Sequence, residues 1–396
     1  MSSLSSQAAR VIAYYLPQFH PIPENDRWWG RGFTEWTNTA RAKPLFRGHY
    51  QPHLPGDLGF YDLRLSETRE AQARLAQEFG IEAFCYYHYW FGGGQRLLER
   101  PFEDVLRSGK PDFPFCLCWA NQAWTGVWHG APNRILIAQT YPGKEDAEQH
   151  FRTLLPAFVD KRYVRVDGRP LFLVYNPTHL PDPAAFTDLW RTLARRSGLA
   201  GVYFVGVENE PWSPEANGFD GATVHNLLLA RRCDGPRWLA RLKRRYRKLR
   251  GWPEFVFPYG KAIRHFAPAE CRKANVYPRA IPNWDNTPRS GAHGLVLHRS
   301  SPELFRRHFR ELLAQIRHKP ADHRIVFVKS WNEWAEGNHL EPDLRFGTRY
   351  LEVVREELQI PRASDTPVRP SGNPPAENPD MPRTAPESDL LKPGPN

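Results

Sequence analysis

The sequence of 396 residues predicts an α/β fold, a (β/α)8 TIM-like barrel followed by a disordered, proline-rich C-terminal tail. Eight short apolar runs alternate with helix-like stretches over about 350 residues, which is the pattern of such a barrel. Clusters of polar and aromatic residues follow most of these runs, always at the carboxyl end of the predicted strand. A doubly wound open sheet is the structural alternative, but no glycine-rich phosphate-binding motif follows any run.

The eight predicted strands are apolar runs of six to ten residues, bounded by polar segments. In chain order they are Val11–Leu16, Ile81–Trp90, Phe113–Ala120, Pro170–Tyr175, Val202–Val207, Ala222–Leu229, Val276–Ile281 and Ile325–Ser330. Helices are expected over residues 66–79, 145–161, 183–198, 237–250, 302–317 and 346–359. We expect Ser66 to cap the first of these helices and Gly80 to end it.

The chain divides into three parts by composition. Residues 1–10 are predicted to be a flexible N-terminus, residues 11–360 a catalytic barrel, and residues 361–396 a disordered tail. The tail contains ten prolines and no aromatic residue, and its net charge is −1. It can therefore bury too little apolar surface to offset the entropy that it would lose on ordering.

Other features favour a cytoplasmic protein without a membrane span. The longest apolar runs are far shorter than the roughly 18–20 residues that cross a bilayer. The N-terminal segment lacks the basic region and apolar core of a signal peptide. Five cysteines form an odd set without framework spacing, and the alternation of Cys116 and Cys118 within a predicted strand indicates reduced thiols.

The net charge of +11 is concentrated in residues 231–250, which contain ten Lys and Arg residues and one Asp. Leu239, Leu242, Tyr246 and Leu249 recur at 3-4-3 spacing, which predicts a basic helix with a narrow apolar stripe. Such a helix suits a solvated outer surface, or peripheral contact with the inner face of an acidic membrane or with a pyrophosphate-linked glycan. Nucleic acid is the remaining alternative, and we do not expect it as a partner.

Aromatic residues are unusually frequent, with 14 Trp, 15 Tyr and 23 Phe, and many of them flank polar residues. Sugars need this mixture, because their C–H faces stack on aromatic rings while their hydroxyl groups require many hydrogen bonds. An aromatic-rich core would explain one such cluster easily, but five less well. We therefore expect an oligosaccharide or polysaccharide substrate, free or linked to a lipid.

The best candidates for catalysis are Glu333 and Glu336, which follow the last predicted strand in the segment SWNEWAEGNH. Residues three apart in a strand point to opposite faces, so both carboxyl groups can share one site only if the chain turns, as Gly337 would permit. Glycoside chemistry requires two carboxyl groups near the anomeric carbon, one of which holds a proton. Burial beside Trp331 and Trp334 would raise a carboxyl pKa.

The polar and aromatic clusters supply the other predicted site residues. Further carboxylates compete for a catalytic role, and they are Glu35, Glu208, Glu210, Asp285, Glu341 and Asp343. Of these, Glu35 and Asp285 have Trp neighbours and are predicted to bind sugar hydroxyl groups. The complete predicted substrate-binding set is Tyr15, Gln18, His20, Trp29, Glu35, Trp36, Tyr87, His88, Trp90, Trp119, Asn121, Gln122, Trp124, Tyr175, Asn283, Trp284, Asp285, Arg289, Trp331, Asn332 and Trp334.

The sequence predicts neither a metal nor another cofactor. His49 and His53 are four residues apart, but Pro52 between them disfavours a regular helix that would present both to one ion. No H-E-x-x-H motif, no G-x-S-x-G motif and no persuasive Cys–His context occurs. A metal-dependent sugar-nucleotide transferase is disfavoured because no acidic motif follows a strand of a nucleotide-binding sheet.

Several long blocks of the sequence resemble one known family. They are FTEWTN, KPLFRGHYQPHLPGDLGFYDLR, GIEAFCYYHYWF, PFCLCWAN, VDGRPLFLVYNP, NWDNTPR and WNEWAEGNHLEPD. They resemble the glycoside hydrolase family 99-like proteins, also called WbsX-type, which belong to bacterial O-antigen and capsule gene clusters. The resemblance extends over residues 11–358.

This resemblance implies a (β/α)8 barrel related to endo-acting α-mannosidases. In those hydrolases, one glutamate of the matching E-W-x-E segment takes the proton of the sugar's 2-hydroxyl group, which attacks the anomeric carbon to form a 1,2-anhydro sugar. The other glutamate acts first as acid and then as base. Carried over by position, Glu333 would be the base and Glu336 the acid/base. A 2-hydroxyl trans to the leaving group implies an α-manno-configured sugar, of the mannose or rhamnose type.

The chain departs from the family pattern at three places. Relatives usually read Trp-Ala-Asn-Glu, whereas this chain has the neutral amide Gln122. An acidic residue commonly expected after the following Trp is replaced, leaving His129 after Trp128. The hydrolases also tend to have His where Ala335 lies. These changes predict altered subsite specificity with the catalytic pair retained.

The sequence thus predicts a carbohydrate-active enzyme of bacterial surface-polysaccharide biosynthesis, related to glycoside hydrolases and transglycosidases and using retaining chemistry. One alternative is a glycosyltransferase with a nucleotide-linked or lipid-linked donor. The other is a non-catalytic, glycan-binding barrel.

Overall fold

The computed structural model describes residues 8–126, 131–208, 212–224 and 226–359. The predicted disordered tail and most of the predicted flexible N-terminus lie outside these ranges. All eight predicted strands are present, and all pair in parallel with their neighbours. They are β1 (Arg10–Tyr15), β2 (Ala83–Trp90), β4 (Phe115–Trp119), β8 (Arg169–Val174), β9 (Tyr203–Glu208), β10 (Gly221–Val224), β12 (Val276–Tyr277) with β13 (Arg279–Ala280), and β15 (Ile325–Val328).

The seventh strand joins the two ends of the sheet, and Pro278 divides it into β12 and β13. β12 pairs with β10 on one side, and β13 pairs with β15 on the other. Proline has no N–H to donate, and the carbonyl of Pro278 accepts a bond from Phe327 N at 3.0 Å. Because β15 pairs in turn with β1, strand pairing continues around all eight positions. The predicted (β/α)8 barrel is confirmed.

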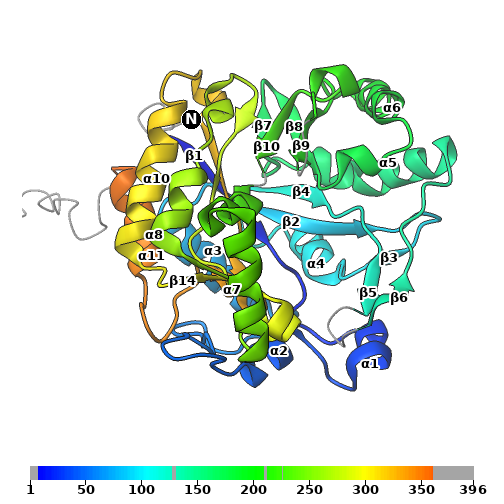
Figure 1. Cartoon of the computed structure of the whole chain (residues 1–396). Coiled ribbons are helices and arrows are strands. Elements are labelled where there is room, and N and C mark those ends of the chain that lie inside the picture. The colour runs from blue at the N-terminus through cyan, green and yellow to red at the C-terminus, as the bar shows by residue number, and fades with distance from the viewer. Residues whose placement is uncertain (1–7, 127–130, 209–211, 225, 360–396) are drawn as a thin grey trace, which may run out of the picture. The chain divides into compact units, whose positions relative to one another are not determined.

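The predicted helices are present, with small shifts at their ends. They are α3 (Ser66–Glu78), α5 (Lys144–Phe158), α6 (Pro183–Arg196), α7 (Arg237–Leu249), α10 (Pro302–Ile316) and α11 (Arg349–Glu357). Ser66 does not cap α3 as predicted, because it is the first helical residue and Leu65 holds the cap position. Gly80 follows this helix with a φ of +82°, as its expected role requires. Helix α5 lies beside α6, and α10 lies beside α11 (Figure 1).

Several shorter elements in the loops are not predicted by the sequence patterns. The helices among them are α1 (Pro23–Trp29), α2 (Glu35–Arg41), α4 (Arg100–Ser108), α8 (Tyr259–Ala262) and α9 (Thr287–Ser290). The short strands are β3 (Arg96–Leu97), β5 (Trp124–Gly126), β6 (Ala131–Ile137), β7 (Arg165–Val166), β11 (Phe255–Pro258) and β14 (Leu295–His298). Their segments are too short, or too rich in turn residues, to show a clear hydrophobic period.

The sixth strand is shorter than predicted. β10 ends at Val224, and residues Asn226–Asp234 form the 3-10 helix η4 instead of continuing the strand. The side-chain amide of Asn226 directs this turn, because it donates to the carbonyls of Phe266 and Arg279, each at 2.8 Å. Leu227 and Ala230 of η4 are then buried in a second core instead of the barrel.

This second, smaller core lies in the segments that follow the sixth and seventh strands. β11 and β14 form a parallel pair there, and buried side chains of η4 and α8 pack with them. Helix α7 lies in the first of these segments and contacts η4. Both segments leave the barrel at the carboxyl ends of strands, the end at which (β/α)8 barrels carry their chemistry.

Candidate active site

The loop after the eighth strand turns sharply, and the turn brings Glu333 and Glu336 to one cavity. Gly337 closes the turn with a φ of +51°, and a Cβ at this position would lie 2.9 Å from Cβ of Asp285. The loop contains β16 (Asn332–Glu333), the 3-10 turn η9 (Trp334–Glu336) and β17 (Asn338–His339), which pairs in antiparallel with β16. The turn that the sequence requires for a shared site is therefore present.

Buried polar contacts fix this loop to the first strand. The side chain of Asn332 accepts a hydrogen bond from Leu16 N at 2.7 Å and donates to Leu16 O at 3.0 Å. Ser330 Oγ accepts bonds from the backbone N–H groups of Asn332 and Glu333, at 3.0 and 2.8 Å. Asn332 thus positions the loop and does not line the cavity, and its role in binding substrate stays a prediction.

Trp331 and Trp334 do not line the cavity either. Their exposed fractions are 0 and 1%. Trp334 stacks on His339 with ring centroids 3.9 Å apart and donates to Glu341 Oε2 at 2.7 Å, while Trp331 packs against Phe84. Both rings support the loop from behind, and no sugar can lie over them without displacing the core.

Glu341 and Asp343, which follow in the same loop, are hydrogen-bonded within the protein. Glu341 accepts hydrogen bonds from Gln72 Nε2 at 2.6 Å and Tyr61 OH at 2.8 Å, in addition to the Trp334 indole. Burial raises the pKa of Glu341 to about 7, although these donors oppose it. Asp343 accepts bonds from backbone N–H groups of the turn that follows it.

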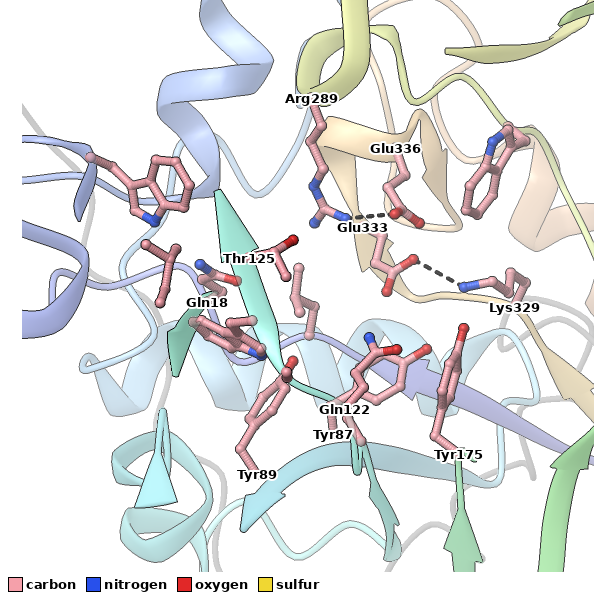
Figure 2. A pocket seen from close by; sticks show the side chains of 17 residues that line it. Gln18, Tyr87, Tyr89, Gln122, Thr125, Tyr175, Arg289, Lys329, Glu333 and Glu336 are labelled. Atoms are coloured by element: carbon pink, nitrogen blue, oxygen red, sulfur yellow. Dashed lines mark hydrogen bonds and ion pairs between the residues drawn. The ribbon is translucent and has the colours of Figure 1, made fainter. Parts of the chain in front are cut away.

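Glu333 and Glu336 line a cavity of about 380 Å³, a size that suits a sugar-sized ligand. In Figure 2, Arg289 and Glu336 lie across the cavity from Tyr87 and Tyr89. The predicted residues that line it are Gln18, Trp29, Tyr87, Gln122, Trp124, Tyr175, Trp284, Arg289, Glu333 and Glu336. The lining residues that the sequence did not predict are Leu16, Tyr89, Ala120, Ala123, Thr125, Leu136 and Lys329.

Three carboxyl groups and two cations form a buried cluster at this cavity. Lys329 Nζ lies 3.3 Å from Glu333 Oε2. Arg289 bridges the other two carboxyl groups, with Nη1 2.6 Å from Glu336 Oε1 and Nη2 3.0 Å from Glu35 Oε2. Two positive charges cannot neutralise three buried negative charges, so one proton on one carboxyl group would balance the cluster.

The surroundings favour Glu336 as the holder of this proton. Burial and the charge of Glu333 raise the pKa of Glu336 to about 8. Burial acts in the same direction on Glu333, but Lys329 and a hydrogen bond with Glu336 hold the pKa of Glu333 below its ordinary value. Burial also raises the pKa of Glu35, which Arg289 opposes. Near neutral pH, a protonated Glu336 therefore faces an ionised Glu333.

Asp285 and Asn283 lie behind the turn that carries Glu336 and do not line this cavity, so their contact with sugar stays a prediction. The Asp285 carboxylate lies 2.5 Å from His49 Nε2 and accepts a bond from Thr287 Oγ1 at 2.6 Å. Asp285 N donates to the carbonyl of Glu336 at 2.6 Å. Asn283 Oδ1 accepts a bond from the backbone of β17 at 3.1 Å. Both residues thus orient the turn that carries Glu336.

Eight more predicted substrate-binding residues lie outside the lining of this cavity, and their contact with substrate stays a prediction. Most of them use their polar atoms within the protein: the Tyr15 hydroxyl donates to Gln72, and the Asn121 amide donates to the carbonyl of Asn176. Glu35 is fully buried behind Arg289. The eight residues are Tyr15, His20, Glu35, Trp36, His88, Trp90, Trp119 and Asn121.

Strand alternation explains why some predicted residues do not line the cavity. Along β2, Tyr87 and Tyr89 line the cavity, so His88 and Trp90 point to the opposite face. There, His88 Nε2 lies 2.8 Å from His150 Nε2 of α5, and Trp90 stacks on the same ring at 4.6 Å. Strict alternation from Tyr87 would have found Tyr89, which the sequence analysis missed.

Lys329 is the most important residue that the sequence analysis missed. It follows the last residue of β15, and only 3% of it is exposed. Its Nζ lies beside Glu333 and 5.1 Å from the centre of the Trp284 ring. Burial would lower the pKa of Lys329, but Glu333 raises it, so the ammonium stays charged. A lysine at the end of a buried apolar run needs a carboxylate partner. This requirement could have identified Lys329 from the sequence.

A family model described as Glycosyltransferase WbsX matches residues 11–354. The chain belongs to the WbsX family. This WbsX-family chain is 41% identical over 360 residues to "Uncharacterized protein WxcX" of Xanthomonas campestris pv. campestris strain B100, a match that covers 88% of the chain and 50% of that relative. The WxcX protein of strain ATCC 33913 gives the same values. The chain therefore spans about half the length of the curated relatives it matches.

The WbsX-family barrel is also similar to solved structures at low sequence identity. A family GH99 endo-α-mannosidase from Bacteroides thetaiotaomicron, in complex with bis-tris-propane, has a TM-score of 0.53 at 13% identity, over 88% of this chain and 96% of that one. A glycoside hydrolase-like protein has a TM-score of 0.54 at 15% identity, over 90% and 96%. Their fold is therefore shared, and the resemblance inferred from the sequence blocks is confirmed.

One departure from the WbsX-family pattern reaches the cavity. Gln122 lines it, and Gln122 Oε1 accepts a bond from Asn176 Nδ2 at 3.4 Å. Ala335 is buried within the turn η9. His129 lies outside the described residues, as does Glu210. The Glu208 side chain is likewise not described.

One group of potential metal ligands lies behind the catalytic loop. The nearest ligand atoms of His53, His339 and Asp343 lie within 4.8 Å of one another. His53 Nδ1 lies 3.0 Å from His339 Nε2, and His339 Nδ1 lies 3.0 Å from the carbonyl of Glu341. The absence of a catalytic metal stays a prediction.

Proposed function

We propose that this WbsX-family chain is a carbohydrate-active enzyme that cleaves or transfers an α-manno-configured glycosidic linkage with retention, in the assembly of a bacterial surface polysaccharide. One observation carries the proposal: Glu333 and Glu336 share a cavity, and their surroundings favour opposite protonation states. Tyrosine, tryptophan and amide side chains around the pair suit the faces and hydroxyl groups of a sugar.

In the first step, the Glu333 carboxylate takes the proton of the sugar's 2-hydroxyl group. The freed oxygen attacks the anomeric carbon, the glycosidic C–O bond breaks, and Glu336 gives its proton to the departing oxygen. In the second step, Glu336 takes a proton from water or from a sugar hydroxyl group, whose oxygen attacks the same carbon. The anhydro ring opens, and its oxygen recovers a proton from Glu333. Two inversions give net retention.

The contact between the two carboxyl groups supports retaining chemistry. Inverting glycosidases hold their carboxyl groups roughly 6.5–9.5 Å apart to leave room for a water molecule. Glu333 and Glu336 instead lie three residues apart in one turn, close enough that each affects the pKa of the other. A base and an acid this close suit two adjacent oxygens of one sugar, O2 and the glycosidic oxygen.

The family's description as a glycosyltransferase favours transfer to a sugar acceptor over hydrolysis in the second step. A donor activated by a nucleotide diphosphate fits the cavity less well. Such a leaving group needs cations that are available to phosphate, whereas Lys329 and Arg289 of the described lining are engaged by glutamates. We therefore propose a glycosidic or lipid-linked donor.

The test compares aryl α-mannosides and α-rhamnosides with their 2-deoxy counterparts. We expect turnover of the 2-hydroxy compounds only, because the 2-hydroxyl is the first nucleophile. Glu336→Gln should lower turnover by about 10²–10⁴-fold on aryl glycosides with poor leaving groups, and by much less on α-mannosyl fluoride, whose first step needs no acid. Glu333→Gln should lose activity on both. Equal rates for the 2-deoxy compounds, or wild-type rates for either variant, would overturn the mechanism.

The same experiment tests the alternative of a non-catalytic barrel. A wild-type chain that binds α-mannosyl or α-rhamnosyl oligosaccharides without turnover, with affinity unchanged in Glu336→Gln, would support glycan binding alone. Calorimetry with the oligosaccharide and product analysis of the same mixture separate the two outcomes.

A further inference from the structure

Helix α7 presents a ridge of large apolar side chains to solvent. Trp238, Leu242, Tyr246 and Leu249 are 64, 57, 50 and 79% exposed. Their 4-4-3 spacing places them along one side of the helix. This apolar ridge differs from the predicted stripe, because Leu239 is partly buried and Trp238 takes its place. Large apolar side chains gathered on one exposed helix face indicate a contact surface.

Polar side chains fasten α7 to the protein, a role that apolar side chains usually have on a surface helix. Arg247 donates to the carbonyls of Glu254 and Val256, at 3.1 and 3.0 Å. Arg244 Nη2 lies 3.4 Å from Asp234 Oδ2. The apolar ridge is therefore not needed for docking the helix onto the second core, and it is left for a partner.

Basic side chains accompany the ridge on the outer side of α7. Arg237, Arg241, Arg245 and Lys248 are all exposed, and none forms an ion pair with a carboxylate among the described residues. The helix contains no acidic residue. Its outer side thus combines strong positive charge with Trp and Leu, the composition of a helix that lies in a membrane interface.

We propose that α7 is a membrane-surface helix that lies on an anionic lipid bilayer. Trp238, Leu242 and Leu249 enter the boundary between headgroups and acyl chains, and the outer Arg and Lys side chains lie at lipid phosphates. Among the helices of the described ranges, none is long and apolar enough to cross a bilayer, so the contact is peripheral. A nucleic acid would use the cations alone and would gain nothing from exposed leucines.

The helix is linked to the candidate active site by a row of packed side chains. The rings of Tyr246 and Trp252 have centroids 5.9 Å apart, and Trp252 lies 5.6 Å from Phe46. Phe46 stacks on His49 at 4.4 Å, and His49 contacts Asp285, whose backbone holds the catalytic turn. Membrane docking through α7 would hold the barrel at the lipid surface. Resting on the proposed function, this points to a glycan carried on a lipid phosphate or pyrophosphate.

Co-sedimentation of the whole chain with vesicles tests the proposal without any substrate. We expect binding to phosphatidylcholine vesicles that contain phosphatidylglycerol, weakening with salt, and little binding to pure phosphatidylcholine. Leu242→Ser/Leu249→Ser keeps every charge and should lower partitioning by about tenfold or more, because two large apolar side chains no longer enter the interface. The matched control is Leu65→Ser/Val159→Ser, which removes two exposed apolar side chains at the ends of α3 and α5 and should bind like wild type.

Other outcomes would contradict the proposal that α7 lies on an anionic bilayer. Absence of binding to the anionic vesicles would do so, and so would equal losses in the two double variants. Binding of a duplex oligonucleotide that is unchanged in Leu242→Ser/Leu249→Ser, without vesicle binding, would assign the basic surface to nucleic acid. Failure of the glycosidase assays would leave these results unaffected, so the two proposals can be judged separately.

Discussion

The loop after the eighth strand and the helix α7 after the sixth use the same residue types in opposite ways. Both contain tryptophan and charged residues, and both follow the carboxyl ends of barrel strands. Trp334 of the loop is 1% exposed, whereas Trp238 of the helix is 64% exposed. Lys329 is buried against Glu333, whereas Lys248 is exposed.

The two regions differ in how far their charged and tryptophan side chains are buried. In the loop, charges are removed from water and must be paired, and burial and the neighbouring charge of Glu333 raise the pKa of Glu336 to about 8. On α7, charges stay hydrated and interact weakly with any single partner, but together they create a field that attracts an anionic surface. Composition alone cannot separate these two uses. The burial of each segment does.

The largest expected contrast is between Trp334→Ala and Trp238→Ala. Trp334→Ala leaves a cavity and removes a hydrogen-bond donor from Glu341, so it should lower the free energy of unfolding by about 3–5 kcal/mol. Trp238→Ala should change it by no more than about 0.5 kcal/mol. Urea denaturation of the two variants measures both values. Similar losses would mean that α7 is packed as tightly as the loop, which would end the comparison.

A second contrast comes from Lys329→Met and Lys248→Met. Lys329→Met leaves the buried Glu333 carboxylate without its cation and should cost about 3–5 kcal/mol of stability. Lys248→Met removes an exposed charge and should be nearly neutral for folding. The double variant Lys329→Met/Glu333→Gln should recover much of the loss, because the unpaired charge is then gone. Urea denaturation provides the values. If the stability changes of the two single variants simply add in the double variant, Lys329 and Glu333 do not interact directly.

The barrel, but not the second core or the short loop elements, could be predicted from the sequence, because each barrel strand lies in an apolar run long enough to show its period. The error at residues 222–229 arose because Leu227 and Leu229 look like strand residues. The strand ends where Asn226 donates hydrogen bonds to the carbonyls of Phe266 and Arg279. These residues are distant in sequence, so a local sequence pattern cannot predict the bonds.

The site was predicted less completely, for two physical reasons. Adjacent aromatic residues on a strand face opposite sides, so only half of a cluster such as YYHYW can reach a ligand. Trp331 and Trp334 could be read as sugar platforms or as core, and only tertiary packing decides between them. Whether Glu333 and Glu336 catalyse stays a prediction, which their shared cavity and opposite pKa shifts support.

The pH dependence of stability sharpens the contrast for Glu336. Its folded-state pKa of about 8 lies above its ordinary value of 4.5, so between these values the folded state binds the extra proton. The contribution of Glu336 to the free energy of unfolding therefore falls as pH rises through this window, by at most about 1.4 kcal/mol per pH unit. Glu336→Gln removes that slope, so its stability relative to wild type should rise toward pH 8. The lowered pKa of Glu333 acts only at lower pH.

Urea denaturation of wild type and Glu336→Gln at several pH values gives this difference directly. Glu341, whose pKa burial also raises, contributes equally to both proteins and cancels. An exposed carboxylate such as Glu67 supplies the control, since Glu67→Gln should not change the slope in this window. A difference between wild type and Glu336→Gln that is independent of pH would place the proton of the cluster elsewhere.

The smallest expected effect distinguishes two arginines of the same helix. Arg241 is exposed beside the apolar ridge, whereas Arg244 reaches inward to Asp234. Arg241→Gln should leave the Tm unchanged and weaken binding to phosphatidylglycerol vesicles by about 1 kcal/mol, roughly fivefold, with a weaker dependence on salt. Arg244→Gln should instead lower stability by up to about 1 kcal/mol, because it loses an ion pair at the surface, and should change vesicle binding less. Equal loss of vesicle binding in both variants would mean that net charge alone, and not the outer side of α7, attracts the chain to the bilayer.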